Sequence, residues 1–406
     1  MDAYPDKNFV SFLISGFREG FDIGYFGPEL LRVSKNLLSA QQNPDQAKVY
    51  LEQEIKAGRI LGPFDDPPLP DFQCHPIGIV PKKTPGKFRV IMDLSYPEGN
   101  SLNDYIDKEE FSLSYVTVDK AIEFIQKLGK GCMLSKVDIK QAFRIVPVSP
   151  SQWHLLGIFW QNKFYIDTCL SMGGRSSPGL FDHLPVALEW ICSKRYGIDY
   201  LCHLLDDFFT AEPVSSKGKN LEVILMVFKH LGIPIAPGKV EGPSSTLEFL
   251  GITLDSIYME ARLSDKKKED LKLLIQQFQG RKKCTKKELL SLIGSLSFAC
   301  KVVVPGRSFL SRLINLSCTV DQLNYKVYIN AQVRKDLAAW KLFLEHWNGR
   351  NFFLDFFQKF HRNLNFDIQA LVFLRFRHEH LNSKTGRISR ILWGSAGDVP
   401  HACSRM

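Results

Sequence analysis

One short segment decides the predicted fold: residues 200–209, Tyr200-Leu-Cys-His-Leu-Leu-Asp206-Asp207-Phe-Phe209. Two adjacent carboxylates, Asp206 and Asp207, lie between apolar runs that favour β-strands, where a neutral turn would be usual. Because neighbouring anions at a tight bend repel each other, they need an offset, and a bound divalent cation such as Mg²⁺ supplies one through carboxylate oxygens. On its own, an Asp-Asp pair would be a solvated turn in most proteins.

A second acidic position upstream favours the metal interpretation. Asp138 ends a short strand-like run, residues 132–137, and a turn follows it. If the two runs pair as neighbouring strands, Asp138, Asp206 and Asp207 converge on one point. Three carboxylates at one end of a sheet can hold two Mg²⁺ ions roughly 3.5–4 Å apart, an arrangement that stabilises the attacking and leaving oxygens of phosphoryl transfer. Alone, Asp138 would be a strand-end residue that caps a turn.

The order of these motifs resembles that of reverse transcriptases. Residues 138–143 are similar to motif A of that family, residues 171–174 (Ser-Met-Gly-Gly) to motif B and residues 205–207 (Leu-Asp-Asp) to motif C. Residues 247–252 resemble the grip strand that follows these motifs in the family. Upstream, residues 76–94 resemble the fingers hairpin.

Within the family, the chain most resembles the DIRS-like retrotransposons of animals, which carry a tyrosine recombinase. Three stretches carry this finer resemblance, at residues 94–97, 143–148 and 302–307. The resemblance as a whole runs from residue 10 to residue 353. In the related elements a ribonuclease H domain follows, but residues 354–406 are similar to it only faintly. The chain is therefore expected to be truncated before a complete ribonuclease H domain.

The resemblance implies an α+β right-hand polymerase, with fingers, an antiparallel palm sheet backed by helices, and a helical thumb. A proline-rich break near residue 66 marks the first predicted boundary. Six segments are expected: an N-terminal extension (1–65), fingers (66–130), a catalytic palm with some fingers elements (131–255), a thumb (256–300), a connection (301–353) and a degenerate tail or ribonuclease H remnant (354–406).

Hydrophobic periodicity and breaker residues predict several local elements. Helices are expected over residues 118–128 and 178–195, the first of them stopped by Gly129. Residues 155–160 and 164–167 are expected to form a hairpin.

The predicted thumb combines helix caps with a basic run. Ser264 is expected to cap its first helix, and Thr285 with Glu288 forms a capping box for the second. Between Arg262 and Lys287 lie ten basic residues and three acidic ones. Such a run is usually a solvated helical face. Its place after the grip strand instead favours contact with a template–primer backbone.

By the resemblance, Asp138 and Asp206 bridge two Mg²⁺ ions, with Mn²⁺ as an alternative. Asp207, the third acidic member of the metal set, supports Asp206 more than it ligates, and the main-chain carbonyl of Ile139 completes the ion on the triphosphate side. The implied reaction is attack of a primer 3′-hydroxyl on the α-phosphate of a deoxynucleotide. The implied partners are an RNA template, a DNA primer and deoxynucleoside triphosphates.

The same motifs imply contacts to the sugar and base of the nucleotide. Phe143 lies five residues after Asp138, where the family has an aromatic gate against a ribose 2′-hydroxyl. The alternative is that Phe143 simply packs in the core. Met172 and Gly173 are expected under the templating base pair, where glycine lets the backbone approach closely.

Basic residues are expected around the triphosphate. Lys82, or Lys83 if the register differs by one residue, and Arg89 match the fingers residues that contact its phosphates. Arginine suits this role through its fork of donors, and lysine through its compact charge. Lys239 matches a basic residue near the leaving pyrophosphate.

Two departures from the family pattern leave a second function open. Leu204 stands where the family usually has the tyrosine of Tyr-x-Asp-Asp, and Ser171 replaces the usual proline of motif B. Neither removes a metal ligand. The sequence therefore predicts an RNA-directed DNA polymerase, with a catalytically weak or dead nucleic-acid-binding remnant as the alternative. A polyprotein fragment with ribonuclease H activity is a third hypothesis, against which the missing acidic set argues.

Composition agrees with a nucleic-acid partner. The 406 residues carry a net charge of +9, and lysine and arginine neutralise phosphates and release counterions. The nine cysteines show no zinc-binding spacing and are interpreted as buried apolar residues in a reducing compartment. The start lacks the features of a signal peptide, and no apolar run is long enough to span a bilayer. An intracellular, soluble protein without a membrane partner is expected, in the cytoplasm or the nucleus.

Overall fold

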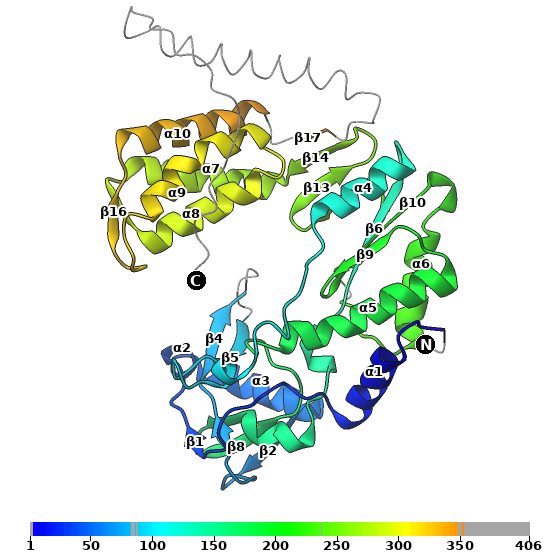
Figure 1. Cartoon of the computed structure of the whole chain (residues 1–406), viewed down its shortest axis with the longest axis vertical. Helices are drawn as coiled ribbons and strands as arrows, with labels where there is room; N and C mark the ends of the chain where they lie inside the picture. The colour runs from blue at the N-terminus through cyan, green and yellow to red at the C-terminus, as the bar shows by residue number, and fades with distance from the viewer. Residues whose placement is uncertain (1–2, 83–85, 87, 237, 348–350, 353–406) are drawn as a thin grey trace, which may run out of the picture. The chain divides into compact units, whose positions relative to one another are not determined.

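The computed structural model describes residues 3–82, 86, 88–236, 238–347 and 351–352. Figure 1 shows the order of its helices and strands along the chain. The expectations for residues 354–406 lie outside the described residues, and so does Lys83, the alternative to Lys82.

An antiparallel sheet carries the acidic motifs. Its strands, in spatial order, are β11 (Glu241–Ser244), β6 (Met133–Asp138), β10 (Asp207–Glu212) and β9 (Leu201–Leu204). Each neighbouring pair is antiparallel. The predicted pairing of the two acidic runs as neighbouring strands is therefore confirmed.

The two faces of this sheet are buried in different cores, because successive side chains of a strand point to opposite sides. On β10, Phe208 contacts Phe228 edge to face, with ring centroids 5.1 Å apart. Its neighbour Phe209 contacts Phe249 on the other face, with centroids 4.7 Å apart. Three helices contact the sheet, namely α4 (Val118–Leu128), α5 (Ser177–Tyr196) and α6 (Lys219–His230).

Two of these helices were predicted with their ends. Helix α4 occupies the expected residues and stops at Gly129, whose φ of 83° suits glycine. Helix α5 begins one residue before the predicted range and ends one residue after it.

A second sheet joins the first part of the chain to strands that come much later. The order is β1 (Arg32–Val33), β3 (Gln73–Cys74), β7 (Gly157–Trp160), β8 (Lys163–Asp167) and β2 (Ile60–Phe64). Strands β7 and β8 form the predicted hairpin, with a shorter first strand and a turn at Gln161 and Asn162, which have φ angles of 49° and 57°. Residues of the predicted N-terminal extension thus pair with residues of the predicted palm.

The fingers motif forms a separate two-stranded hairpin, as expected. Strand β4 (Ile77–Pro81) pairs with β5 (Phe88–Met92) in an antiparallel register. Three helices of the first part of the chain are α1 (Lys7–Glu19), α2 (Leu38–Gln41) and α3 (Pro44–Lys56).

The predicted grip strand is a hairpin instead of one strand. Strand β12 (Thr246–Phe249) turns at Leu250 and Gly251, with φ angles of 48° and 78°, and returns as β13 (Ile252–Asp255). The apolar run is continuous in sequence, but these two positive φ angles reverse the chain within it. Strands β14 (Glu260–Leu263) and β17 (Asn351–Phe352) complete this sheet.

Helices follow this sheet in the last described part of the chain. They are α7 (Asp265–Gly280), α8 (Lys286–Ala299), α9 (Ser311–Ser317) and α10 (Ala331–Leu342), with the strand pair β15 (Lys283–Thr285) and β16 (Lys326–Tyr328). The capping box of Thr285 and Glu288 is confirmed. Ser264 is the N-cap of α7 as predicted, but its side chain makes no cap hydrogen bond. One hydrophobic core includes residues of all four helices, on both sides of residue 300.

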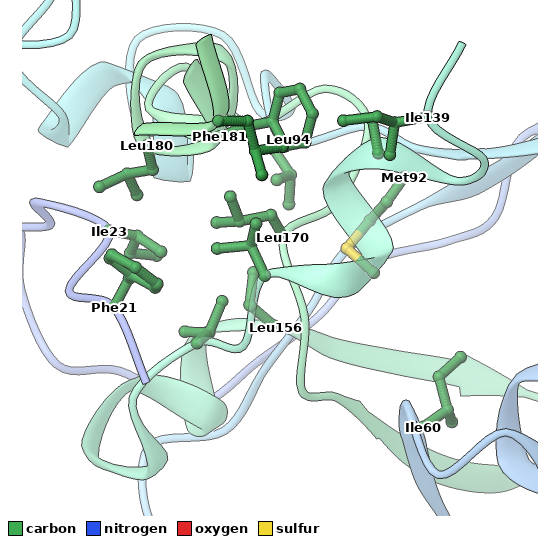
Figure 2. Packing of buried hydrophobic residues seen from close by; sticks show 14 of the residues in the cluster. Phe21, Ile23, Ile60, Met92, Leu94, Ile139, Leu156, Leu170, Leu180 and Phe181 are labelled. Carbon is green, nitrogen blue, oxygen red and sulfur yellow. The ribbon is translucent and has the colours of Figure 1, made fainter. Parts of the chain in front are cut away.

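The largest core lies next to the acidic motifs. Figure 2 shows Met92 from β5, Ile139 from the segment after β6, and Leu180 and Phe181 from α5 among its side chains.

Seven of the eight described cysteines are buried and Cys318 is exposed, so the prediction of buried cysteines is wrong only for Cys318 within the described residues. Among the described helices, none is long and apolar enough to cross a membrane.

A buried charge network, not predicted from the sequence, connects three elements. Arg144 donates to both carboxylate oxygens of Asp167 on β8, at 2.8 and 2.7 Å. Its Nε donates to Glu54 of α3 at 3.0 Å, and Arg59 also binds Glu54, with two contacts of 2.8 Å. The side chains of Glu54 and Asp167 are 4% and 1% exposed. Removing the arginine would leave two buried carboxylates short of their partner.

We expect Arg144→Met to destabilise the chain by about 3–5 kcal/mol, because breaking a buried ion pair leaves an uncompensated buried charge. Urea unfolding followed by circular dichroism measures the change. Lys48→Met is the control, since Lys48 and Glu52 are paired at 3.9 Å and both are more than 60% exposed; its cost should stay below about 1 kcal/mol. Equal effects of the two variants would contradict the importance of the network.

Candidate active site

The Asp-Asp motif occupies a tight hairpin. Strands β9 and β10 pair with Leu204 opposite Asp207, so only Leu205 and Asp206 form the turn between them. Leu205 has a φ of 51°, which residues with a side chain rarely adopt. This backbone conformation costs on the order of 1–3 kcal/mol. This turn places Asp206 at the tip of the hairpin and Asp207 at the first position of β10.

The neighbouring strand brings the third carboxylate to the same place. Asp138, the last residue of β6, lies opposite Asp207 in the antiparallel register. Such directly opposed residues have Cα atoms roughly 4.5–5.5 Å apart. The backbone N–H of Ile139 donates to the carbonyl of Asp206 at 2.9 Å, which ties the turn to the end of β6. All three predicted catalytic carboxylates thus meet at one end of the sheet.

Burial and mutual repulsion both disfavour the ionised forms of these carboxylates. Burial raises the pKa of Asp207 to about 6, and the charges of Asp206 and Asp138 contribute in the same direction. Burial and the nearby Asp138 also raise the pKa of Asp206. Cations oppose this effect: Lys239 and Arg89 both favour the ionised form of Asp206. The site therefore attracts positive charge.

Lys239 supplies part of that charge directly. Its ammonium Nζ lies 2.5 Å from Oδ2 of Asp138, and this contact raises the pKa of Lys239. The lysine side chain is 61% exposed whereas that of Asp138 is 7% exposed. The ammonium can therefore move into solvent while the carboxylate stays.

The donor set fits divalent cations. In the described part of the chain, no three Asp, Glu, His or Cys side chains are already arranged to hold a metal ion, and Asp138 is paired with Lys239 instead. The three converging groups are carboxylates, the oxygen ligands that Mg²⁺ prefers. Burial and the repulsion between carboxylates raise the pKa of Asp206 and Asp207, so the nearby cations of the protein do not offset the whole cost of their charge. Lys239 contacts one of the two carboxylate oxygens of Asp138, Oδ2.

Phe143, the predicted sugar gate, follows Asp138 by five residues. Phe143 belongs to a short 3₁₀ turn, Ala142–Ile145, and its ring contacts that of Phe181 edge to face, with centroids 5.5 Å apart. Arg144, the next residue, is held by the buried charge network. Phe143 is only partly buried, so its ring packs on α5 and keeps some exposed surface.

The predicted base-pair platform is a loop before α5. Met172 is 40% exposed, and Gly173 has a φ of 117°. A Cβ atom on Gly173 would lie 2.6 Å from the carbonyl oxygen of Met92, so glycine is required by the approach of β5. Asn103 holds the loop, donating to the carbonyl of Gly173 at 2.8 Å and accepting from the N–H of Arg175 at 2.7 Å. The sequence reasoning missed Asn103, since no motif marks a residue 70 positions away.

The remaining predicted phosphate contacts lie on the fingers hairpin. Arg89 pairs with Val80 across β4 and β5, and its charge acts on Asp206. Lys82 is exposed directly after β4. Direct contacts join the carboxylates with Ile139 and Lys239, whereas the other predicted residues lie on neighbouring elements: Phe143, Met172, Gly173, Lys82 and Arg89.

His203 on β9 is a second residue that the sequence reasoning did not single out. Its Nδ1 lies 2.5 Å from a carboxylate oxygen of Glu189, and its Nε2 lies 3.5 Å from Asp182, both on α5. Burial alone lowers the pKa of His203, but hydrogen bonds to Asp182 and Glu189 outweigh burial and raise it to about 9. A charged imidazole thus holds the Asp-Asp hairpin onto α5.

Comparison with known proteins identifies the fold. No protein-family model matches the chain. The foamy viral protease-reverse transcriptase dRH in complex with double-stranded DNA superposes over 80% of this chain and 51% of its own, with a TM-score of 0.62 and 20% identity. The chain has a reverse transcriptase polymerase fold. The foamy viral enzyme in complex with an RNA/DNA hybrid matches with a TM-score of 0.58 and 20% identity, over 80% of this chain and 39% of that one.

Two viral polyproteins are similar in sequence. The Pro-Pol polyprotein of feline foamy virus is 27% identical over 228 residues, which are 55% of this chain and 17% of the polyprotein. Polyprotein P3 of Commelina yellow mottle virus is 21% identical over 267 residues, 65% of this chain and 12% of that polyprotein. The chain thus spans less than a fifth of the length of each.

We expect His203→Gln to make stability depend less on pH. The folded pKa of about 9 exceeds the ordinary value of about 6.5, so the charged imidazole stabilises fully below pH 6.5 and this contribution is lost as pH rises to 9. The variant should lose up to about 3 kcal/mol at pH 6 and much less above pH 9.

Thermal and urea unfolding across this pH range provide the measurement. His230→Gln is the matched control, because His230 is an exposed histidine at the end of α6. A stability loss for His203→Gln that is the same at pH 6 and pH 9.5 would rule out a charged His203.

Proposed function

We propose that this chain is an RNA-directed DNA polymerase that extends a DNA primer on an RNA template with deoxynucleoside triphosphates and two divalent ions, Mg²⁺ or Mn²⁺. One observation carries the proposal: Asp138 lies opposite Asp207 in the sheet, with Asp206 at the adjoining turn. The polymerase fold supports it. So does the similarity to a foamy viral Pro-Pol polyprotein.

In this proposal Asp138, Asp206 and the main-chain carbonyl of Ile139 would hold the ions, and Asp207 would support Asp206. The bound ions would lower the pKa of the primer 3′-hydroxyl and neutralise charge on the triphosphate. Lys239 would leave Asp138 and contact the pyrophosphate side of the nucleotide. Its exposed stem supports this movement, since only the ammonium is held.

The neighbouring elements would select and position the nucleotide. Arg89 and Lys82 on the fingers hairpin would contact its phosphates, which agrees with the electrostatic effect of Arg89 on Asp206. The ring of Phe143 would exclude a 2′-hydroxyl. Met172 and Gly173 would lie under the templating base pair, with Asn103 holding their loop.

We further propose a DIRS-like retrotransposon as the origin of the chain, on the three sequence stretches that resemble those elements. The predicted division into an extension, fingers, palm, thumb and connection is part of this proposal. The RNA template and nucleotides are found inside cells, which supports an intracellular protein.

A second candidate function is nucleic-acid binding without catalysis. Leu204 replaces a tyrosine that the family uses beside its Asp-Asp pair. In addition, the ammonium of Lys239 is paired with the carboxylate of Asp138. A chain of this kind would bind primer–template in a salt-dependent manner and incorporate no nucleotide.

Primer extension on poly-rA with oligo-dT tests the main proposal. We expect incorporation with Mg²⁺ or Mn²⁺, its loss in excess EDTA, and its return when the metal is restored. Asp206→Asn should lower the rate at least about 100-fold. Losing a metal ligand would remove several kcal/mol of the stabilisation that the ions give to the charge of the transition state. Asp199→Asn, at an exposed residue before β9, should retain activity. Persistent extension by Asp206→Asn would refute the assignment, and binding without extension by the unmodified chain would favour the second candidate.

The sugar gate is tested with Phe143→Val. A smaller side chain should admit a ribonucleotide, so the ratio of kcat/KM for deoxynucleotide over ribonucleotide should fall at least about tenfold. Phe143→Tyr keeps the ring and should keep the ratio. If the valine variant loses extension of both nucleotides equally, Phe143 acts as core packing, as the alternative interpretation holds.

A further inference from the structure

The strand pair β15–β16 presents one buried face and one exposed face. Cys284 and Val327 lie opposite each other and are each 3% exposed. Lys283 lies opposite Tyr328, and Thr285 lies opposite Lys326. Because side chains alternate along a strand, these last four residues form the outer face, which we call the ribbon face.

An aromatic ring and an ammonium meet on the ribbon face. Tyr328 is 65% exposed, and Nζ of Lys283 lies over its ring, 4.3 Å from the centroid. A large ring that keeps most of its surface in water gains little from packing, but it offers a flat face to a ligand. The ammonium of Lys283 lies over this ring, which places a cation directly against the exposed aromatic surface.

The surroundings of the ribbon face are strongly basic. Residues 281–287 read Arg-Lys-Lys-Cys-Thr-Lys-Lys, and Lys326 adds another cation across the strand pair. Glu288, the nearby acid, is engaged by Arg281 at 2.8 Å and by the N–H of Thr285 at 2.7 Å. Lys282, Lys287 and Lys326 are all exposed. The face therefore suits a polyanion.

We propose that the ribbon face binds single-stranded nucleic acid. A base would stack on Tyr328, while Lys283 and Lys326 contact phosphates. Exposed aromatic side chains within a basic surface are the combination that binds single strands without sequence preference, since every base has a π-face. A purely electrostatic surface would hold a duplex backbone equally well. The exposed ring on the ribbon face is what favours an unpaired strand.

This surface belongs to a different sheet from the strands that carry Asp138, Asp206 and Asp207, so it can be tested without catalysis. The full chain is titrated into a fluorescein-labelled dT20 oligonucleotide in EDTA, and binding is followed by anisotropy at several salt concentrations. Tyr328→Ala should weaken binding about fivefold or more, since stacking is worth roughly 1–3 kcal/mol per base. Tyr328→Phe keeps the ring and should stay within about twofold of the unmodified chain.

The lysines are tested by their effect on salt dependence. Lys283→Ala/Lys326→Ala should reduce the slope of log K against log salt by about 1.4, since each phosphate contact on a single strand contributes about 0.7. Lys194→Ala/Lys229→Ala removes the same charge from exposed positions of α5 and α6 and should leave the slope nearly unchanged. Circular dichroism identifies any variant that fails to fold. If Tyr328→Ala does not fold, Tyr328→Phe and the two lysine pairs decide whether the ribbon face binds the oligonucleotide.

Two results would overturn the proposal: unchanged dT20 binding by Tyr328→Ala, or an equal loss of slope in both lysine pairs, which would leave only a solvated basic surface. Loss of binding with Tyr328→Ala but not with Tyr328→Phe would support it. This outcome stands even if the chain extends no primer. Failure of the polymerase proposal and failure of the ribbon-face proposal are thus distinguishable.

Discussion

The antiparallel pairing of β6 with β10 is the constraint on which the candidate active site depends. It sets Asp138 opposite Asp207, and the two-residue turn between β9 and β10 adds Asp206. Burial and the repulsion among three carboxylates at one sheet end raise the pKa of Asp206 and Asp207. The pairing persists because Phe208 and Phe209 bury opposite faces of the same strand in two cores. Hydrophobic burial thus offsets the electrostatic cost of the site.

Three basic residues near the acidic motifs in sequence or structure differ in how deeply their ion pairs are buried. Arg144 is held on both sides by buried acids, and it fixes the turn that carries Phe143. His203 holds the Asp-Asp hairpin on α5. Lys239 binds Asp138 from an exposed position, so its ammonium can move into solvent at little structural cost. The buried ion pairs of Arg144 and His203 thus hold the elements of the site in place, whereas the ion pair of Lys239 is accessible to solvent.

Local sequence signals predicted the elements that depend on neighbouring residues. Helix α4 ends at Gly129 because glycine adopts a positive φ without steric cost. The capping box at Thr285 likewise needs only residues three apart. The grip strand was predicted wrongly as one strand, since an apolar run does not reveal that Leu250 and Gly251 reverse the chain.

The sequence by itself determined the order and spacing of the acidic motifs, and from them the predicted chemistry, because each motif is a short run of residue types with specific chemical properties. Only the tertiary structure decided which distant side chains hold those motifs in place. Asn103 supports the loop at Gly173, and Glu54 and Asp167 hold Arg144, through contacts between residues far apart in the chain. Such contacts leave no periodic or local signal, since they exist only after the sheets have brought the segments together.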